Sequence, residues 1–171
     1  MGNTIKGQFP VSKFKNIETP FYYYDAELLR NTLTTIKEES GKYGYKVHYA
    51  IKANANHDVL ALISSYGLGA DCVSGNEVKA AIEAGFKPSD IVFAGVGKTD
   101  KEINFALDND IFCFNVESVP ELEVINDLAT IKGKTAKVAL RINPNVDAHT
   151  HQKITTGLNE NKFGFSMNDI K

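Results

Sequence analysis

Short apolar runs alternate with amphipathic segments along most of the chain. Residues 25–40 predict a helix, because their leucine and isoleucine side chains recur at helical spacing and glycines follow them. The aromatic run 20–25 ahead of it predicts a strand. The later apolar runs predict strands over 46–54, 67–74, 90–95, 111–118 and 136–144. The amphipathic segments between them predict helices over 57–66, 75–85, 99–109 and 119–130.

Strands that alternate with single helices form a parallel sheet, and these strands are apolar enough to be covered on both faces. A doubly wound sheet and a (β/α)8 TIM barrel both fit this order. No G-x-G-x-x-G motif opens a helix after the first strand, and the strand–helix repeat is regular, which favours the barrel. A barrel typically needs about 250 residues. The pattern therefore indicates an α/β fold that is a partial barrel.

Polar residues lie near the carboxyl ends of several predicted strands. Alternation along 46–54 places Ala50 and Lys52 on one face. By the same count, Asp71, Asn115 and Arg141 lie toward that side of their own strands. Enzyme sites on barrels lie at the carboxyl ends of the strands, so we expect these side chains to converge there. We call the side of the sheet that they share the inner face. The alternative is that each strand simply ends and becomes solvated.

Lys52 is the candidate catalytic residue. An ammonium inside a barrel costs several kcal/mol in desolvation, and burial lowers the pKa of an amine. A neutral amine attacks an aldehyde to form a Schiff base. We therefore expect Lys52 to meet a carbonyl, either of a substrate or of pyridoxal phosphate. Asp71 is either its structural ion-pair partner or a group that tunes the amine.

Composition and charge exclude several function classes. The 171 residues carry a formal charge of −2, which gives no basic footprint for nucleic acid. No apolar run is long enough to span a membrane, and the start lacks the apolar core of a secretory signal. Cys72 and Cys113 lie in apolar runs, where we expect reduced core thiols. These features predict a cytoplasmic protein with no metal site.

Several motifs together resemble the fold-type III pyridoxal-phosphate decarboxylases. "HYAIKAN" is similar to their cofactor-lysine strand, and "RINPNVDAHTH" with "TTGLNENKFGF" is similar to their diaminopimelate branch. "TPFYYYD", "GADCVSGNEVKAAIEAG", "IVFAGVGKTDKEI" and "CFNVESVPELEVIN" match in the same order. The resemblance covers nearly the whole chain from Thr19 onward. It implies a barrel of the alanine racemase-like type.

The resemblance also implies an activity and its residues. Lys52 corresponds to the lysine that holds pyridoxal 5'-phosphate in a Schiff base, and Asp71, Arg141 and Ala50 correspond to cofactor-binding positions. Glu77 corresponds to a position lining the same area. The implied reaction is decarboxylation of meso-2,6-diaminopimelate to L-lysine and CO2, the last step of lysine biosynthesis. The implied partner is a second copy, forming a homodimer, with no nucleic acid or membrane partner.

Four motifs of the family lie downstream of Lys171 in its members. They are a His-x-Gly-Ser strand, a glycine-rich phosphate loop, a Glu-Pro-Gly-Arg motif and a Cys-Glu-Ser segment. We therefore interpret residues 26–171 as the first part of the cofactor-binding barrel. Residues 1–25 are expected to associate with a β-rich second domain, to which the strand at 20–25 would belong. We predict that the 171-residue chain alone is inactive.

Other features admit more than one interpretation. "GVGK" at 95–98 follows a strand and suggests a phosphate nest, although it is not a Walker loop. The histidines at 149 and 151 are a weak metal signal, and the polar loop 145–161 suits a lid or substrate role. Lys162 corresponds to a dimer-contact position or is a solvated strand-end lysine.

Three other functions compete with the decarboxylase. One is a non-catalytic barrel that carries pyridoxal phosphate, against which the segment 147–164 argues. Another is a decarboxylase of the same fold for a different basic amino acid. The last is an aldolase that forms a Schiff base through Lys52 without a cofactor.

Overall fold

The computed structural model describes residue 7 and residues 9–143 and 163–166. It divides the chain into two compact units, Met1–Val47 and His48–Lys171. In the described part of the chain, no helix is both long enough and apolar enough to cross a membrane. The assignment of residues 1–25 to a β-rich second domain stays a prediction.

The first unit contains a short helix, α1 (Val11–Phe14), and a long one, α2 (Ala26–Gly41). The carboxylate of Asp25 caps α2 by accepting a hydrogen bond from the backbone N–H of Leu28 at 2.9 Å. This confirms the helix that the sequence predicts over 25–40, to within a residue at each end.

The strand predicted over 20–25 is wrong for this structure, because those residues form no strand. A strand needs a neighbour that accepts its backbone hydrogen bonds. In the described part of the first unit no other strand is present. Two aromatic side chains of the run instead pack around Phe14, with ring centroids 5.3 Å away for Phe21 and 5.0 Å away for Tyr23.

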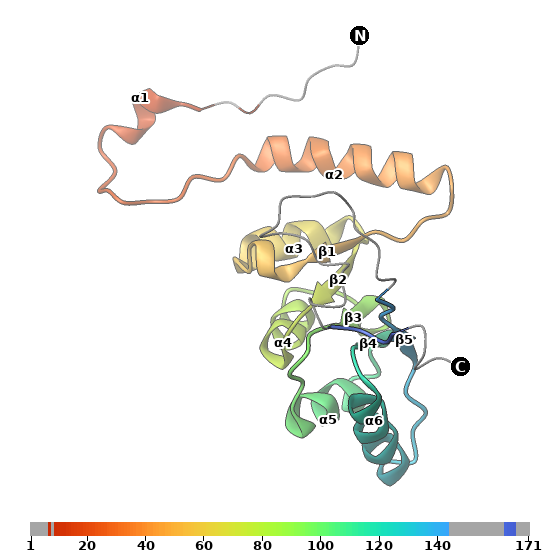
Figure 1. Cartoon of the computed structure of the whole chain (residues 1–171). Coiled ribbons are helices and arrows are strands. Elements are labelled where there is room, and N and C mark those ends of the chain that lie inside the picture. The colour runs from red at the N-terminus through yellow and green to blue at the C-terminus, as the bar shows by residue number, and fades with distance from the viewer. Residues whose placement is uncertain (1–6, 8, 144–162, 167–171) are drawn as a thin grey trace. The chain divides into compact units, whose positions relative to one another are not determined.

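The second unit is a parallel sheet whose strands follow chain order, β1-β2-β3-β4-β5 (Figure 1). Its strands are β1 (His48–Ala50), β2 (Gly69–Cys72), β3 (Ile91–Phe93), β4 (Cys113–Val116) and β5 (Val138–Leu140). Its helices are α3 (His57–Ser65), α4 (Gly75–Glu83), α5 (Asp100–Asp108) and α6 (Val119–Ile131), with 3-10 turns η1 (Ile51–Ala53) and η2 (Pro88–Asp90). A doubly wound sheet reverses its strand order at a switch point. Sequential order without reversal is that of a barrel, which confirms the partial barrel.

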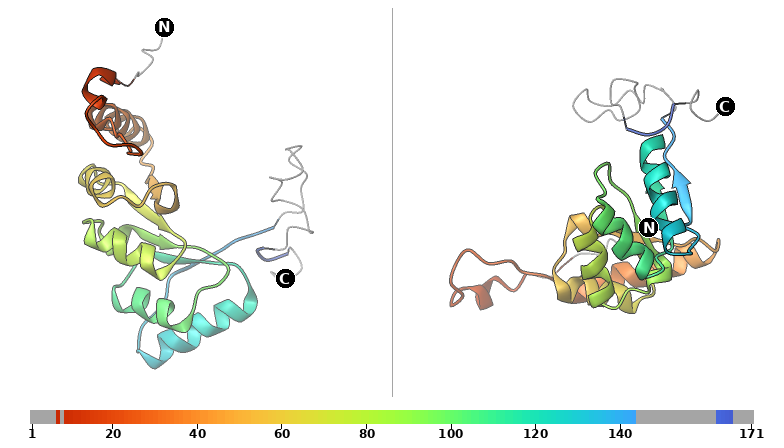
Figure 2. Two further views of the ribbon diagram at one scale, coloured as in Figure 1. Left: turned by 90° about the vertical axis from the view of Figure 1, so that its left-hand side faces the viewer. Right: turned by 90° about the horizontal axis from the view of Figure 1, so that it is seen from below.

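Helices α3 to α6 lie one after another along the sheet, as both views of Figure 2 show. The face that they cover holds the core, because each strand alternates a buried side chain toward the helices with one toward the inner face. Ile51, Phe93 and Phe114 are among its largest fully buried side chains. The core accounts for the fold, since burial of this size supplies most of the stabilisation in a domain.

Residues Phe163–Ser166 extend the sheet beyond β5. Ile142 forms an isolated parallel bridge with Phe165, whose N–H donates to the carbonyl of Arg141 at 2.7 Å. Phe165 is buried at 4 % exposure. Gly164 has φ +98°, and a Cβ on it would lie 2.7 Å from the carbonyl oxygen of Arg141. Only glycine fits this close approach.

Capping side chains fix where the helices begin. Thr99 forms a capping box with Glu102, and Ser118 accepts from the N–H of Glu121 at 3.4 Å. Asn56 caps α3 through two backbone N–H groups. Each cap gives a partner to a backbone N–H that has none within its helix.

Glu102 joins two helix starts, and its charge should make stability depend on pH. Its carboxylate accepts from the N–H of Thr99 at 3.0 Å and from the N–H of Gly75, at the start of α4, at 2.7 Å. These bonds lower the pKa of Glu102 below its ordinary 4.5. The stabilisation that the charged Glu102 provides is therefore complete above pH 4.5. It is lost as the pH falls through the pKa that Glu102 has in the folded state.

We expect Glu102→Gln to lower the free energy of unfolding by about 1 kcal/mol at neutral pH, since it weakens both caps. The difference from the parent should shrink in acid, which urea denaturation at several pH values would measure. Glu83→Gln is the matched control, because this exposed glutamate meets only Lys79 at 3.8 Å. An equal loss in both variants, or a loss that persists in acid, would contradict the prediction.

Gly69 lies opposite His48 in the pairing of β1 with β2. A Cβ on Gly69 would overlap the His48 imidazole and the backbone carbonyl oxygen of Asp90. We expect Gly69→Ala to destabilise the unit by about 1–3 kcal/mol, because the backbone must shift to admit a methyl group. Gly97→Ala is the control, since nothing lies within 4 Å of its Cβ position. Chemical denaturation of both variants checks this, and equal stabilities would refute it.

Candidate functional site

The register of the sheet brings the predicted inner-face residues to one side. Ala50 pairs with Asp71 between β1 and β2, and Asn115 pairs with Ala139 between β4 and β5. Paired residues of parallel strands point to the same face. The shared face expected for Ala50, Asp71 and Asn115 is therefore confirmed, and alternation from Ala139 adds Arg141.

Lys52 lies directly after β1, at the carboxyl end of the strand. The expectation that it belongs to the strand and is buried is wrong, because the backbone enters η1 at Ile51 and the Lys52 side chain is exposed. Ile51 occupies the buried position instead, at 0 % exposure, and the N–H of Asn54 closes the turn on its carbonyl at 3.1 Å. Five strands do not enclose the end of β1, so the desolvation argument does not apply to Lys52 in this structure.

The Lys52 amine forms no hydrogen bond or ion pair with another described residue. The structure therefore does not pair it with Asp71 or Arg141, although all three lie at the same end of the sheet. A primary amine that is exposed and without such a partner is accessible to an aldehyde. This is the arrangement that a Schiff-base lysine requires before the carbonyl compound arrives.

Acidic groups surround the end of β2. Glu77 accepts from the N–H of Val73 at 2.8 Å, so its carboxylate lies at the β2–α4 connection, one residue beyond the strand. Burial, with the nearby charges of Glu77 and Asp71, raises the pKa of the Cys72 thiol to about 12. Burial also raises the pKa of Cys113. Both cysteines are buried and free, as the sequence predicts, and at neutral pH they are thiols rather than nucleophilic thiolates.

Arg141 supplies the cation of the site. Its Nη1 donates to Oε2 of Glu117 at 2.9 Å, and Glu117 is only 8 % exposed. The Glu117 carbonyl accepts from the N–H of Gly164 at 3.1 Å, so Glu117 binds both the arginine and the segment beside it. The guanidinium is therefore held by an ion pair while remaining partly open to water.

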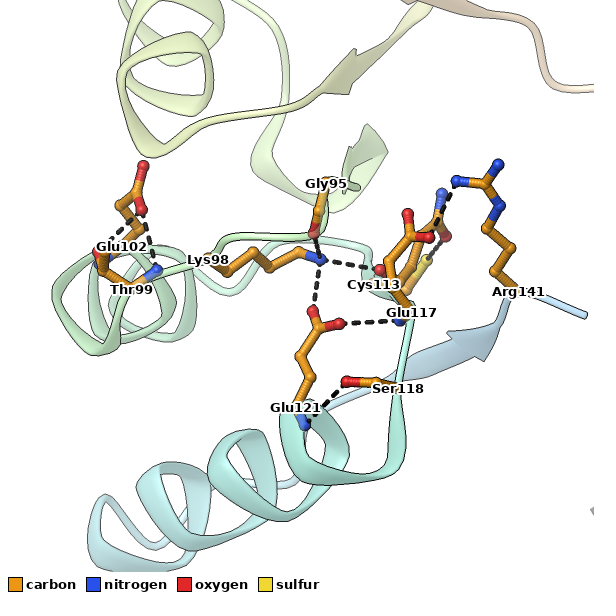
Figure 3. A network of polar contacts seen from close by, with 10 residues as sticks. Gly95, Lys98, Thr99, Glu102, Cys113, Glu117, Ser118, Glu121 and Arg141 are labelled. Carbon is orange, nitrogen blue, oxygen red and sulfur yellow. Dashed lines mark hydrogen bonds and ion pairs between the residues drawn. The ribbon is translucent and has the colours of Figure 1, made fainter. Parts of the chain in front are cut away.

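A buried lysine, Lys98, lies beside this pair, as Figure 3 shows. The Lys98 side chain is 0 % exposed, and its Nζ lies 2.6 Å from Oε1 of Glu121. It also donates to the carbonyl oxygens of Gly95 and Asn115, both at 2.8 Å. All three of its protons are therefore used. The amine therefore has no proton left for an anion, while the phosphate nest suggested for the backbone at 95–98 stays a hypothesis.

Three interpretations fall on residues that the structure does not describe. They are the metal signal at 149 and 151, the lid at 145–161 and the dimer contact at Lys162. In the described ranges, no group of three or more histidine, cysteine, aspartate or glutamate side chains is arranged to hold a metal ion.

The network of Lys98, Glu121 and Glu117 is the part of the site that sequence reasoning missed. The sequence marked Lys98 as a loop lysine and Glu121 as a helix-start residue. Nothing in strand or helix periodicity indicates that residues 23 positions apart form an ion pair. The available signal was the lysine itself, placed in a glycine-rich loop after a buried strand.

Three comparisons place these residues among known proteins. Residues 27–171 match the family described as the pyridoxal binding domain of pyridoxal-dependent decarboxylases. A diaminopimelate decarboxylase of Bacteroides thetaiotaomicron is 62 % identical over 167 residues, which cover 97 % of this chain and 43 % of that protein. The chain thus spans less than half the length of this relative.

Two solved structures share the fold. Diaminopimelate decarboxylase from Helicobacter pylori, in complex with L-lysine, is 44 % identical with a TM-score of 0.84, over 94 % of this chain and 41 % of that one. Diaminopimelate decarboxylase from M. jannaschii is 38 % identical with a TM-score of 0.82, over 93 % and 38 %.

Proposed function

Because this chain belongs to the pyridoxal-dependent decarboxylase family, we propose that it forms the lysine-bearing part of an enzyme that decarboxylates meso-2,6-diaminopimelate to L-lysine and CO2. The observation that carries the proposal is the accessible Lys52 amine just after β1, at the same end of the sheet as Asp71 and Arg141. The identity of 62 % to a diaminopimelate decarboxylase supports the choice of substrate.

The described residues fit pyridoxal 5'-phosphate. Lys52 would hold its aldehyde covalently, and Asp71, Arg141 and Ala50 would line the site around it. When bound, the cofactor supplies an electron sink for the carbanion that loss of CO2 leaves. Ala50 lies opposite Asp71 in the pairing of β1 with β2.

Each charged residue has a role that follows from its surroundings. The Lys52 amine, once displaced by substrate, is free to carry a proton at Nζ. Arg141 presents a fixed cation to anionic groups, since Glu117 holds one side of its guanidinium. Asp71 places a carboxylate on β2, opposite Ala50 of the strand that precedes Lys52.

The wider setting of the enzyme belongs to the same proposal. We expect a homodimer, a cytoplasmic location and a place at the last step of lysine biosynthesis. The most useful supporting observation is the L-lysine bound to the Helicobacter pylori relative, because L-lysine is the product of the proposed reaction.

The proposal is tested by joining residues 1–171 to the remainder of the Bacteroides thetaiotaomicron relative. We expect this hybrid, loaded with pyridoxal phosphate, to release CO2 from meso-diaminopimelate in preference to ornithine or arginine. Release from ornithine or arginine alone would assign the chain to another branch of the family. Cofactor binding without turnover of any of the three would indicate a non-catalytic carrier.

The 171-residue chain by itself should release no measurable CO2 from meso-diaminopimelate. Its described sheet leaves β5 exposed, with Val138 and Leu140 each 41 % exposed, so the barrel core is open on that side. An open site admits water and cannot hold substrate on all sides. A radiochemical CO2 assay checks this, and turnover at the rate of the hybrid would contradict the proposed structure of the site.

A further inference from the structure

The side chain of Lys98 is the most completely buried cation that the described residues contain, and nothing in the proposed chemistry uses it. It lies in the loop between β3 and α5, at the carboxyl end of the sheet, where the site is. Phe93 lies below it, with the ring centroid 5.3 Å from Nζ. Burying an ammonium and a carboxylate together brings little net stability, since desolvation offsets most of their attraction. A role in arranging neighbouring groups accounts better for its presence.

Glu121, the ion-pair partner of Lys98, also binds the backbone at the end of the next strand, β4. Glu121 binds Lys98 through Oε1, and its Oε2 accepts from the backbone N–H of Glu117 at 2.8 Å. A carboxylate held at both oxygens has no rotational freedom left. The Glu117 backbone is thereby fixed at the end of β4, as the dashed lines of Figure 3 trace.

The side chain of Glu117 completes the path. Its Oε2 binds Nη1 of Arg141 at 2.9 Å. Three charge-assisted hydrogen bonds thus connect Lys98 to Arg141, and each is between 2.6 and 2.9 Å long. They are joined through the covalent structure of Glu121 and Glu117. Such bonds are shorter and stronger than those between neutral groups.

We infer that Lys98 is a positioning residue for Arg141, acting through Glu121 and Glu117, and that it fixes the guanidinium at the point where cofactor and substrate bind. The inference rests on the proposed function for its meaning, because Arg141 belongs to the proposed site. The linkage itself is a property of this chain and is testable without any activity.

A second lysine provides a matched control. Lys134 also joins two connections, donating to the Leu107 carbonyl at 2.6 Å and to Asp110 Oδ1 at 2.8 Å. It lies between α6 and β5, at the amino ends of the strands and away from Arg141. Lys134→Met removes a more exposed lysine anchor, 32 % exposed against 0 % for Lys98, from the opposite end of the sheet. Lys98→Met and Lys134→Met therefore separate positioning of Arg141 from general stability.

The first test observes Arg141 directly in the 171-residue chain. Arg30 is the other arginine of the sequence, so the two guanidinium signals in a nitrogen-15 NMR spectrum are assigned by Arg141→Lys. We expect the Arg141 Nη1 protons, which donate to Glu117, to exchange with water more slowly than those of Arg30. Lys98→Met should bring their exchange close to that of Arg30, whereas Lys134→Met should leave it unchanged.

If Lys98→Met does not fold, Glu121→Gln interrupts the same path, because an amide nitrogen replaces one of the two acceptor oxygens. An Arg141 exchange rate that neither variant changes would overturn the inference. So would an equal change in Lys134→Met, since that would show a general loss of stability.

The second test measures the coupling in the cofactor-loaded hybrid. We expect Lys98→Met to lower kcat/KM about ten-fold, within the range seen for coupled residues, and to cause no further loss in an Arg141→Ala background. Additive losses would overturn the inference. An inactive unsubstituted hybrid would instead count against the proposed function, and the NMR result would still decide the linkage.

Discussion

Lys52→Ala is expected to abolish covalent attachment of pyridoxal phosphate to this chain. Borohydride reduces a Schiff base to a stable secondary amine, so treatment of the loaded parent should leave a phosphopyridoxyl group on the peptide that contains Lys52. The exposed Lys52 amine, at the carboxyl end of β1, is the group that we propose attacks the aldehyde. Mass spectrometry of the digested protein measures the modified fraction at each lysine.

The same substitution is expected to remove decarboxylation in the hybrid. Loss of the covalent anchor and of a proton-carrying amine should lower kcat by about 10²–10⁴-fold, the range that a positioned acid or base contributes. Lys52→Arg should be as inactive as Lys52→Ala, because a guanidinium keeps the charge but does not form the linkage. Lys52→Ala and Lys52→Arg together test whether the reaction requires the amine itself or only a positive charge.

Lys79→Ala is the control for both measurements. Lys79 lies on α4, is 63 % exposed and meets Glu83 at 3.8 Å, so its removal should leave labelling and turnover as in the parent. Equal labelling of positions 52 and 79 would show only that exposed lysines react with an aldehyde. That outcome, or full activity of Lys52→Ala, would remove Lys52 from the proposed reaction.

The order of the strands and helices was predictable from sequence because each signal is local. An apolar run such as 111–118 and a capped helix start such as Ser118 depend on residues within a few positions of one another. Sequential βαβ units then leave few topologies to consider. The face shared by Ala50 and Asp71 followed from alternation alone.

The errors arose where a non-local partner decides the structure. The run 20–25 has strand composition, but a strand forms only beside another strand. Counting by twos placed Lys52 in a strand, whereas the backbone turns at Ile51 to bury that side chain in the core. The strand therefore ends where Ile51 becomes buried, and no pattern in the neighbouring residues predicts this end.

The path from Lys98 to Arg141 shows the same limit at the site. Lys98 lies in the β3–α5 loop, Glu117 directly after β4 and Glu121 in the first turn of α6. Sequence composition gives the charges but not their pairing. This is why the residues proposed to bind the cofactor are easier to recognise than the residues proposed to position them.

Phe93→Ala is expected to cause the largest loss of stability. Phe93 is 0 % exposed, packs against Phe114 with ring centroids 6.1 Å apart, and lies beneath the Lys98 ammonium. Truncating a fully buried phenylalanine costs about 3–5 kcal/mol, because the cavity adds to the lost transfer free energy. Whole domains are stable by only roughly 5–15 kcal/mol, so most of the folded population of this open sheet is at risk.

Urea denaturation followed by circular dichroism measures this loss, with Phe112→Ala as the matched control. Phe112 directly precedes β4, the strand next to β3, but it is 39 % exposed and should cost far less. Phe93→Leu should fall between the two, since it keeps apolar volume under Lys98. Phe93 therefore has two roles: its ring fills the core and also supports the Lys98 ammonium, which positions Arg141. A loss no larger for Phe93→Ala than for Phe112→Ala would refute this connection.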